Sequence, residues 1–246
     1  MSGAPALPAG FTLVALDSVG STNDEARRLA LGGAGHFTVV TAALQTAGRG
    51  RRGRAWVSPR GNLHCSLIVA PGRPLAEAAQ LSFVAGLSLA EALAGLIEAQ
   101  VACKWPNDVL VDGRKVAGML LETVERDDLL VLGVGVDVRE APEQALHSAA
   151  SLAEYGFQGG AFEVLSAFCD RFAVWFGRWA AEGFAPVREA WLERAAGLGA
   201  TAEIRLPGET LSGLFAGLDG QGALLLDPPN GERRRVLAGD VFFGTR

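Results

Sequence analysis

The pattern of apolar residues changes near residue 197, and this change limits the architectures open to the chain. Before it, helical and strand patterns are mixed; within 161–181, for example, apolar residues recur every three or four positions, as on one face of a helix. After it, only short β-like runs remain, separated by Gly, Pro and Asp turns. We therefore predict two domains, residues 1–196 and residues 197–246. The first is predicted to be α+β because its strands and helices do not alternate regularly, and the second a small all-β barrel.

Individual strands and helices can be placed along the chain. In the first domain we expect strands at 11–16, 37–43, 63–70, 101–104 and 129–138, a hairpin beginning at 109, and helices at 22–31, 75–98 and 161–181. In the second domain we expect strands at 202–206, 211–218, 223–226 and 234–237. Thr22 and Glu25 have the spacing of a capping box, which predicts that their side chains cap the first helix.

Composition argues against several classes of protein. Hydrophobic residues make up 49% of the 246 residues and charged residues 20%, so the chain can bury a large core. The formal net charge of −5 argues against a general nucleic-acid-binding protein. The most apolar stretch, between Glu77 and Glu91, is too short to span a membrane as a helix. The first ten positions contain no basic residue and the three cysteines are far apart, so we expect no signal peptide and a cytoplasmic protein with free thiols. Cysteines and histidines form no cluster with metal-binding spacing, so we expect no protein metal site.

The segment from Gly48 to Gly53 contains three glycines and three arginines. It fits the pattern G-x-G-x-x-G, but a dinucleotide-binding turn needs a helix starting at the glycines, and Trp56 and Pro59 follow soon after instead. Glycines let a backbone approach an anion closely, and guanidinium groups bind phosphate through paired hydrogen bonds. The segment therefore predicts a phosphate-binding loop; the alternative is a solvated basic loop.

A second candidate is the segment from Lys104 to Asp108. A lysine at the end of a core-like strand is costly to bury without an anionic partner, so Lys104 is a candidate ligand for a phosphate or carboxylate. The alternatives are a lysine that reaches solvent or one that pairs with Asp108.

Other polar and small residues carry weaker signals. Ser21-Thr22-Asn23 at a helix start is first of all a cap, although its groups could also bind the polar head of a ligand. Gln45 ends an apolar strand, where surface exposure is the simple explanation. Gly133 and Gly135 within one strand suggest close approach, either by a ligand or by a packed element.

Together these segments resemble the biotin protein ligases, which attach biotin to carrier proteins. The resembling segments, in order, are residues 21–23, 45–59, 104–108, 115–122, 133–136 and 218–224. The resemblance implies a mixed β-sheet catalytic domain flanked by helices, similar to class II synthetases, and a C-terminal SH3-like barrel. It implies that biotin and MgATP give biotinyl-adenylate and pyrophosphate, after which a lysine of a biotin carboxyl carrier protein attacks the adenylate.

The resemblance also implies a role for individual residues. Lys104, Arg49 and Arg51 would be catalytic. The biotin-binding residues would be Ser21, Thr22, Asn23, Gln45, Arg49, Gly50, Arg51, Lys104, Gly118 and Gly135. The ATP- or adenylate-binding residues would be Gly48, Arg49, Gly50, Arg51, Arg52, Gly53, Trp56, Lys104, Asn107 and Asp137. The segment containing the arginines would order over the adenylate, and Mg²⁺ would arrive with the phosphates and need no dedicated protein site.

Two features depart from the family pattern. The family often has Asn near the adenine where this chain has Asp137, and a carboxylate can accept a hydrogen bond from the adenine amino group but cannot donate one to a ring nitrogen. Some relatives carry an N-terminal helix-turn-helix that represses transcription. Only about eleven residues precede the first expected strand here, so we expect no DNA binding. Relatives often form dimers, which makes a homodimer an open expectation.

Three other functions remain open from the sequence. A lipoate or octanoate ligase or transferase shares the catalytic fold, but the polar set Ser21, Thr22 and Gln45 suits a ureido group better than an alkyl chain. A non-catalytic module that binds biotin would not need both Lys104 and the glycine-arginine segment. A peptide adaptor acting through the terminal barrel would leave that segment unexplained.

Overall fold

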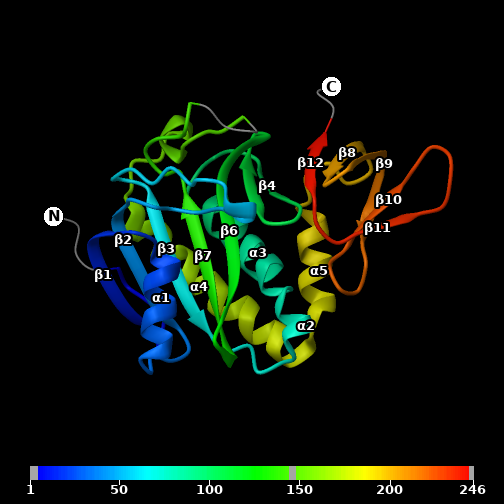
Figure 1. Ribbon diagram of the computed structural model, residues 1–246. Coiled ribbons are helices and arrows are strands. Elements are labelled where there is room, and N and C mark those ends of the chain that lie inside the picture. Colours follow the sequence, from blue (N-terminus) through cyan, green and yellow to red (C-terminus); the bar gives the residue numbers. More distant parts are fainter. Residues whose placement is uncertain (1–4, 144–147, 244–246) are drawn as a thin grey trace.

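The computed structural model describes residues 5–143 and 148–243 and contains two β-sheets (Figure 1). The larger sheet has the strand order β1-β2-β3-β7-β6-β5-β4. Its strands are β1 (Thr12–Val19), β2 (Thr38–Gln45), β3 (Leu63–Val69), β4 (Val101–Lys104), β5 (Asp108–Val111), β6 (Arg114–Val124) and β7 (Arg126–Val136). Strands β1 and β2 pair in parallel and all other neighbours are antiparallel, so the expected mixed sheet is confirmed.

Helix α1 (Thr22–Leu31) connects the two parallel strands and covers one face of the sheet. Its apolar side chains Ala26 and Ala30 pack into a small core with Val40, Ile68 and Val131 from the strands beneath. Because β3 is covered on both faces, all of its residues are buried, as expected for an interior strand.

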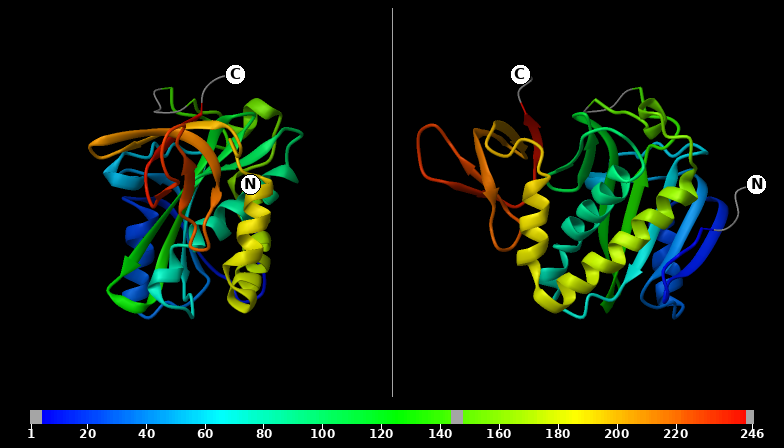
Figure 2. Two further views of the ribbon diagram at one scale, coloured as in Figure 1. Left: turned by 90° about the vertical axis from the view of Figure 1, so that its right-hand side faces the viewer. Right: turned by 180° about the vertical axis from the view of Figure 1, so that it is seen from behind.

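The opposite face is covered by α3 (Leu81–Ala94) and α4 (Ala161–Glu182), as the view from behind shows (Figure 2), and α5 (Phe184–Glu193) packs against these two helices and against the second sheet. Helix α3 is apolar on nearly all sides because it lies between the sheet and the two outer helices. Helix α4 directs Phe168, Phe172 and Trp179 into this larger core, which agrees with the expected helix at 161–181.

The single helix expected at 75–98 is wrong. The structure has a short α2 (Leu75–Ala78) and a separate α3 that ends at Gly95. At this break the backbone N–H groups of Gln80 and Ser82 donate to carbonyls three residues earlier, which is the tighter 3₁₀ pattern and interrupts the α-helix.

Helix α5 was not expected from the sequence. It begins directly after Gly183, whose φ of 82° and ψ of −163° suit glycine and let the chain turn sharply at the end of α4. Two short 3₁₀ turns, η1 (Arg51–Gly53) and η2 (Leu152–Tyr155), complete the helical elements.

The second sheet has the order β11-β10-β9-β8-β12, with antiparallel pairs throughout. Its strands are β8 (Thr201–Leu206), β9 (Glu209–Leu218), β10 (Leu224–Asp227), β11 (Arg234–Val236) and β12 (Asp240–Phe243). Four of them match the expected runs, and β12 was missed because it is short and begins with an aspartate. No pairing joins β11 to β12 among the described residues, so the strands form an open sheet there rather than a closed barrel.

The two sheets lie side by side and are joined by direct contacts (Figure 1). The buried indole of Trp105, after β4, donates from Nε1 to the carbonyl of Gly222 in the second sheet at 3.0 Å. Arg188 of α5 donates to the carbonyl of Leu218 at 2.9 Å. The division at residue 197 stays a prediction; it falls in the segment between α5 and β8. None of the described helices combines the length and apolar character needed to cross a membrane.

We expect Trp179→Phe to destabilise the protein by about 2 kcal/mol, because it removes the donor that satisfies a buried amide. Trp179 is fully buried, and its Nε1 donates to Oε1 of the buried Gln80 at 2.8 Å. Urea denaturation would measure the free energy of unfolding. Val174→Ala on the exposed side of the same helix is the control and should change it by less than about 0.5 kcal/mol. Equal effects of the two changes would contradict this account of the core.

Candidate functional site

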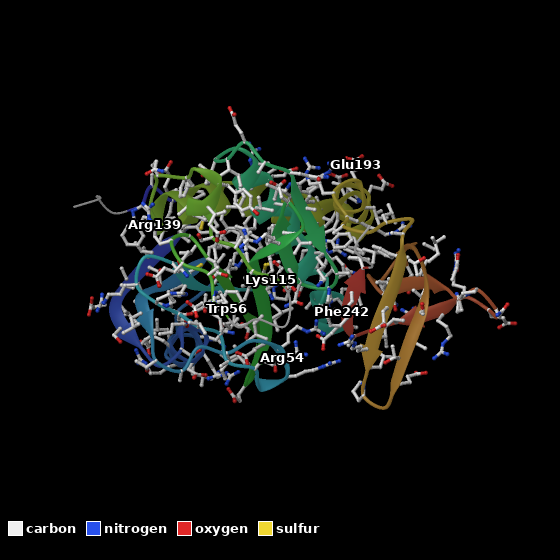
Figure 3. The ribbon with its side chains drawn as sticks, turned by 90° about the horizontal axis from the view of Figure 1, so that it is seen from above. Arg54, Trp56, Lys115, Arg139, Glu193 and Phe242 are labelled. Carbon is white, nitrogen blue, oxygen red and sulfur yellow. The ribbon has the colours of Figure 1, made fainter. Side chains whose placement is uncertain are left out.

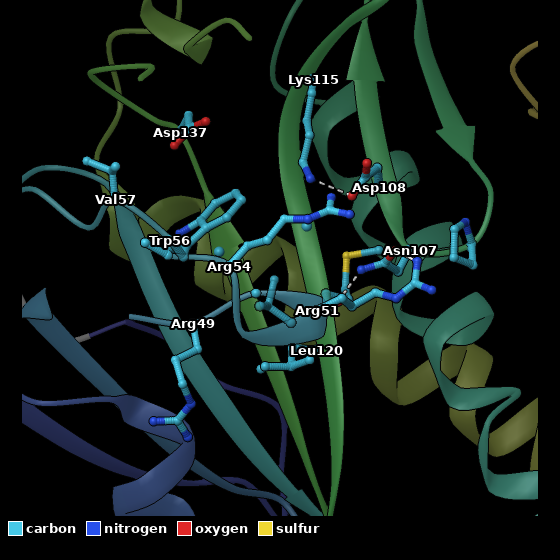
Figure 4. Close-up of a pocket in the computed structure, with 18 of the residues that line it drawn as sticks. Arg49, Arg51, Arg54, Trp56, Val57, Asn107, Asp108, Lys115, Leu120 and Asp137 are labelled. Atoms are coloured by element: carbon cyan, nitrogen blue, oxygen red, sulfur yellow. Dashed lines mark hydrogen bonds and ion pairs between the residues drawn. The ribbon is translucent and has the colours of Figure 1, made fainter. Parts of the chain in front are cut away.

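A pocket of about 350 Å³ lies at one end of the larger sheet, and the segment joining β2 to β3 passes over it (Figure 4). Most of the residues predicted for the site line this pocket: Ser21, Thr22, Asn23, Gln45, Arg49, Gly50, Arg51, Trp56, Lys104, Asn107, Gly118, Gly135 and Asp137. Three predicted residues, Gly48, Arg52 and Gly53, are not among those that line it. Five of the six segments singled out in the sequence therefore contribute residues to one cavity, and the segment 218–224 does not.

A hydrogen-bond network joins the start of α1 to the end of β2. Gln45 accepts at Oε1 from the backbone N–H of Thr22 at 2.8 Å and from its hydroxyl at 3.0 Å. Gln45 Nε2 donates to Ser58 Oγ at 2.9 Å. Gln45 is therefore fixed at both ends of its amide, and simple surface exposure does not describe it.

The capping box predicted at the start of α1 is wrong. The N-cap residue is Ser21, whose side chain makes no capping hydrogen bond. Glu25 forms an ion pair with Arg28 at 2.7 Å instead of capping the backbone. Thr22 and Asn23 are buried and direct their side chains to residues of the sheet. The start of this helix thus supplies polar groups to the pocket at the expense of its own cap.

Asn23 shows how tightly this region is packed. It donates from Nδ2 to Glu122 Oε2 at 2.7 Å and accepts at Oδ1 from Ser66 Oγ at 2.5 Å. A Cβ atom on Gly133 would overlap the Asn23 amide. The glycine at 133 therefore makes room for a side chain of the protein itself.

The arginine loop, defined as residues 48–54, is held in a tight conformation. A Cβ atom on Gly48 would lie 2.5 Å from the carbonyl of Trp56 and 2.6 Å from Ser58 Oγ, so a larger residue would force a shift. Arg52 has a positive φ of 58°. Strand β3 rather than a helix follows the loop, so it is not a dinucleotide-binding turn.

The arginines of the loop point in different directions (Figure 4). Arg49 forms a bidentate ion pair with the Asp24 carboxylate, with N–O distances of 2.6 and 2.7 Å, on the α1 side of the pocket. Arg51 points to the opposite side, where Nη1 donates to Asn107 Oδ1 at 3.0 Å. Burial lowers the pKa of Arg51, although a guanidinium stays charged at neutral pH. Of these two, Arg51 directs its charge into the cavity.

Lys104 lies at the end of β4 with only 6% of its surface exposed, so the alternative of a lysine that reaches solvent is wrong. Burial lowers its pKa to about 8, while the charge of Asp108 acts in the opposite direction. Its Nζ lies 5.8 Å from the ring centre of Phe242 in β12. Asp108 faces it across the hairpin but forms its short ion pair, at 2.6 Å, with Lys115. The pocket thus holds a buried ammonium group that is mostly charged at neutral pH.

Trp56 lies against two glycines of the sheet. A Cβ atom on Gly135 would lie 2.5 Å from Trp56 Nε1, and one on Gly118 would lie 3.4 Å from Cζ3 of the same ring. Lys115 Nζ lies 5.4 Å from the ring centre, within cation–π range. The indole Nε1 is buried and has no hydrogen-bond partner among the described residues. Because neither glycine has a side chain, the Trp56 ring can pack directly against the backbone of the sheet.

Asp137 follows β7 and is 3% exposed. Its Oδ1 accepts from Asn62 Nδ2 at 3.3 Å. Burial raises its pKa to about 7, and the charge of Lys115 only partly opposes this. Near neutral pH a large fraction of Asp137 is therefore protonated, and a protonated carboxyl can donate a hydrogen bond.

Positive charge predominates in the pocket although the chain as a whole has a net charge of −5. The basic residues that line it are Arg49, Arg51, Arg54, Lys104 and Lys115, and the acidic ones are Asp108, Asp137 and Asp240. A concave site with this balance favours an anionic ligand. Within residues 5–143 and 148–243, no group of three or more His, Cys, Asp or Glu side chains could hold a metal ion.

Sequence reasoning missed four charged residues of the site. Lys115 and Asp108 lie in segments that the sequence had singled out, but Lys115 was given no role and Asp108 only that of a possible partner of Lys104. Arg54 directly follows the predicted glycine-arginine segment. Asp240 comes from β12, and nothing in a four-residue terminal run indicates that it reaches a pocket in the other domain.

Comparisons with known proteins agree with this site. The model of the Biotin/lipoate A/B protein ligase family matches residues 18–138, and that of the Biotin protein ligase C terminal domain matches residues 198–244. A biotin–[acetyl-CoA-carboxylase] ligase from Paracoccus denitrificans is 43% identical over 91% of this chain and 97% of its own length.

Two further relatives extend the comparison. The bifunctional ligase/repressor BirA of Bacillus subtilis is 31% identical over 96% of this chain and 75% of its own length. The structure of the biotin protein ligase from Aquifex aeolicus in complex with biotin and ATP superposes with a TM-score of 0.83 and 30% identity, covering 95% of this chain and 99% of that one. The chain belongs to the biotin/lipoate A/B protein ligase family and is a biotin protein ligase by sequence and by fold.

Proposed function

We propose that the pocket activates biotin with ATP to give biotinyl-5′-adenylate and pyrophosphate, and that the protein then transfers biotin to a lysine of a biotin carboxyl carrier protein. One observation carries the proposal: the same cavity has polar hydrogen-bonding groups at the end next to α1 and cationic side chains, including the buried Lys104, at its other end. The relatives named above have this activity in their names, or bind biotin and ATP in their structures.

The polar end suits the bicyclic head of biotin. The ureido group offers two N–H donors and one carbonyl acceptor, and Ser21, Thr22 and Gln45 offer hydroxyl, backbone and amide partners. Asn23 lies beside them within the same network. An alkyl chain or dithiolane would cover polar atoms that the network leaves unsatisfied, such as the second N–H of the Gln45 amide, and burying them without hydrogen bonds is costly. This argument favours biotin over lipoate or octanoate.

The cationic end suits the reacting groups. A biotin carboxylate oxygen attacks the α-phosphorus of ATP and pyrophosphate leaves, so two anions must approach each other. Lys104 and Arg51 lie where they can offset this repulsion and stabilise charge on the transition state. Arg49 and Gly50 line the same cavity and contribute to the loop over it. Positioning and electrostatics are sufficient for this step, because it needs no protein nucleophile.

The nucleotide base is proposed to lie near Trp56 and Asp137, with Asn107 closer to the phosphates. The buried indole Nε1 of Trp56 can donate to a ligand acceptor, and a protonated Asp137 can donate to a ring nitrogen as an asparagine would. Gly118 and Gly135 keep the sheet backbone open beside the ring. Magnesium belongs to the MgATP substrate, and no step is assigned to a protein-bound metal.

In the second step the ε-amine of a carrier lysine attacks the carbonyl of the mixed anhydride, and AMP leaves. Until then the anhydride must be kept from water, which is the role we propose for the arginine loop, including Gly48, Arg52 and Gly53. We also propose that the protein acts in the cytoplasm, without binding DNA, and that it can form a homodimer. The boundary between the catalytic and C-terminal domains is proposed at residue 197.

Exchange of pyrophosphate into ATP tests the proposed function directly. We expect biotin to support exchange by the full chain, and lipoate and octanoate to support little, because they lack donors and acceptors for the polar network. The measurement is incorporation of labelled pyrophosphate into ATP with each acid at matched concentration. Exchange with lipoate that equals or exceeds exchange with biotin would identify a lipoate ligase instead.

We expect Lys104→Ala to lower the rate of adenylation by about a hundredfold or more, because a positioned cation at a charge-developing centre contributes roughly 3 kcal/mol. Single-turnover formation of biotinyl-adenylate measures this rate. Circular dichroism and the melting temperature control for folding, and Lys104→Arg tests whether charge alone is sufficient. A folded Lys104→Ala variant with the wild-type rate would show that this lysine is only structural.

Asp137→Asn tests the buried carboxyl. A folded-state pKa of about 7, raised from 3.8, means that ionisation of the buried group opposes folding as pH rises. Between pH 5 and pH 8 the wild type should therefore lose about 2–3 kcal/mol of stability relative to the variant, which does not ionise. Urea denaturation at the two pH values measures the difference. The same stability difference at both pH values would rule out a raised pKa at this residue.

A further inference from the structure

One carboxylate connects the arginine loop to the C-terminal sheet. Asp240, the first residue of β12, accepts at Oδ2 from Arg52 Nη1 at 3.1 Å and also from Arg54 Nη2. The Asp240 side chain is 18% exposed, whereas those of the two arginines are 37% and 44% exposed. Arg54 and Asp240 are 186 positions apart in the sequence, so only the assembled fold brings them together.

The charges around Asp240 keep it ionised. Burial acts to raise its pKa, but the hydrogen bond from Arg54 and the charges of Arg54, Arg52 and Arg51 outweigh burial and hold the pKa below its usual range. Two guanidinium groups therefore share one ionised and largely buried oxygen. Such charge-assisted bonds are stronger than an ion pair between two fully exposed side chains.

Strand β12 is a rigid support for this carboxylate. Asp240 and Val241 pair with Arg205 and Ile204 of β8, and both Val241 and Ile204 are almost completely buried. Asp240 and Val241 also line the pocket. In the view from above, Arg54 lies nearer than Trp56 to the strand that carries Phe242 (Figure 3). The C-terminal domain therefore forms part of the pocket wall at the point where the loop ends.

The loop arginines differ in what they bind. Arg52 and Arg54 bind Asp240, whereas Arg51 donates to the neutral amide of Asn107. A carboxylate partner would neutralise the charge of Arg51. The amide of Asn107 is neutral, so the positive charge of Arg51 can still attract an anionic ligand. The contacts thus separate arginines that hold the loop from the one that faces the substrate.

We propose that Asp240 is a positioning residue that fastens the arginine loop over the pocket from the C-terminal domain, so that the reactive adenylate is retained until a lysine attacks it. The inference rests on the proposed function, because it concerns retention of that intermediate. It assigns the C-terminal domain a direct part in closing the active site.

Asp240→Asn in the full chain tests the proposal with two measurements. The first is the initial rate of tryptic cleavage within residues 48–54, followed by mass spectrometry, which should rise about three- to tenfold when the charged bonds are lost. The second is the rate at which biotinyl-adenylate is released, which should rise by a similar factor. The single-turnover rate of adenylate formation should change much less, because Lys104 and Arg51 are retained and Asp108 still acts to raise the pKa of both.

Asp227→Asn is the matched control. Asp227 is a carboxylate of the same sheet that forms an ion pair with Arg233 at 2.6 Å and does not line the pocket. It should change neither cleavage nor release, and Asp240→Glu should restore part of the wild-type behaviour. If Asp240→Asn does not fold, the double variant Arg52→Gln, Arg54→Gln removes the same bonds from the loop side, and its adenylate release should rise likewise.

The outcomes distinguish a failure of the positioning role of Asp240 from a failure of the proposed function. Wild-type rates of loop cleavage and adenylate release in folded Asp240→Asn would overturn the positioning role. A wild-type chain that forms no biotinyl-adenylate would overturn the proposed function, and the cleavage comparison would then still decide whether Asp240 fastens the loop.

Discussion

Lys104 is buried and Arg51 is partly buried in the pocket, and this burial lowers the pKa of both. Burying such charges is costly unless compensating groups lie nearby. The fold places Asp108 and Asp240 close enough to act on these cations, yet directs the shortest ion pairs of the two carboxylates to Lys115 and to Arg54. Both cations line the cavity, where their charge favours an anionic ligand.

The polar end of the pocket depends on side chains at the start of α1 that do not cap their own helix. A helix start normally uses its first side chains to satisfy its own N–H groups. In α1 the side chain of Ser21 makes no such bond, and Thr22 and Asn23 bind partners in the sheet. The apolar contacts of α1 with the strands beneath compensate for the missing cap. The helix thus presents polar groups to the cavity while its opposite end stays anchored in a core.

Local patterns in the sequence predicted the α+β class and most of the helices and strands, whereas most of the pocket residues were predicted from the resemblance to biotin protein ligases. Apolar periodicity identified α4, and turns rich in Gly, Pro and Asp identified four of the five C-terminal strands. The sequence did not predict α5, β12 or the break between α2 and α3, where single glycines or tightened turns decide the path of the chain. It also missed Asp240, because a contact between residues 186 positions apart leaves no local signal. The capping box failed since tertiary partners competed for Thr22.

The proposed intermediate, biotinyl-adenylate, is a mixed anhydride that water can hydrolyse. It serves the reaction only if the site keeps water away and still admits the lysine amine that attacks it. A loop rich in glycine loses much conformational entropy when it closes, so the proposed closure needs contacts that hold the loop in addition to its contacts with the substrate. In this protein those contacts come from opposite sides of the cavity: Asp24 on α1 holds Arg49, and Asp240 on β12 holds Arg52 and Arg54. Because Asp240 belongs to the C-terminal sheet, the positioning role that we propose for it makes the packing of that sheet against the rest of the protein part of the chemistry. A change that loosens this interface would weaken closure without touching any group that contacts the reacting atoms.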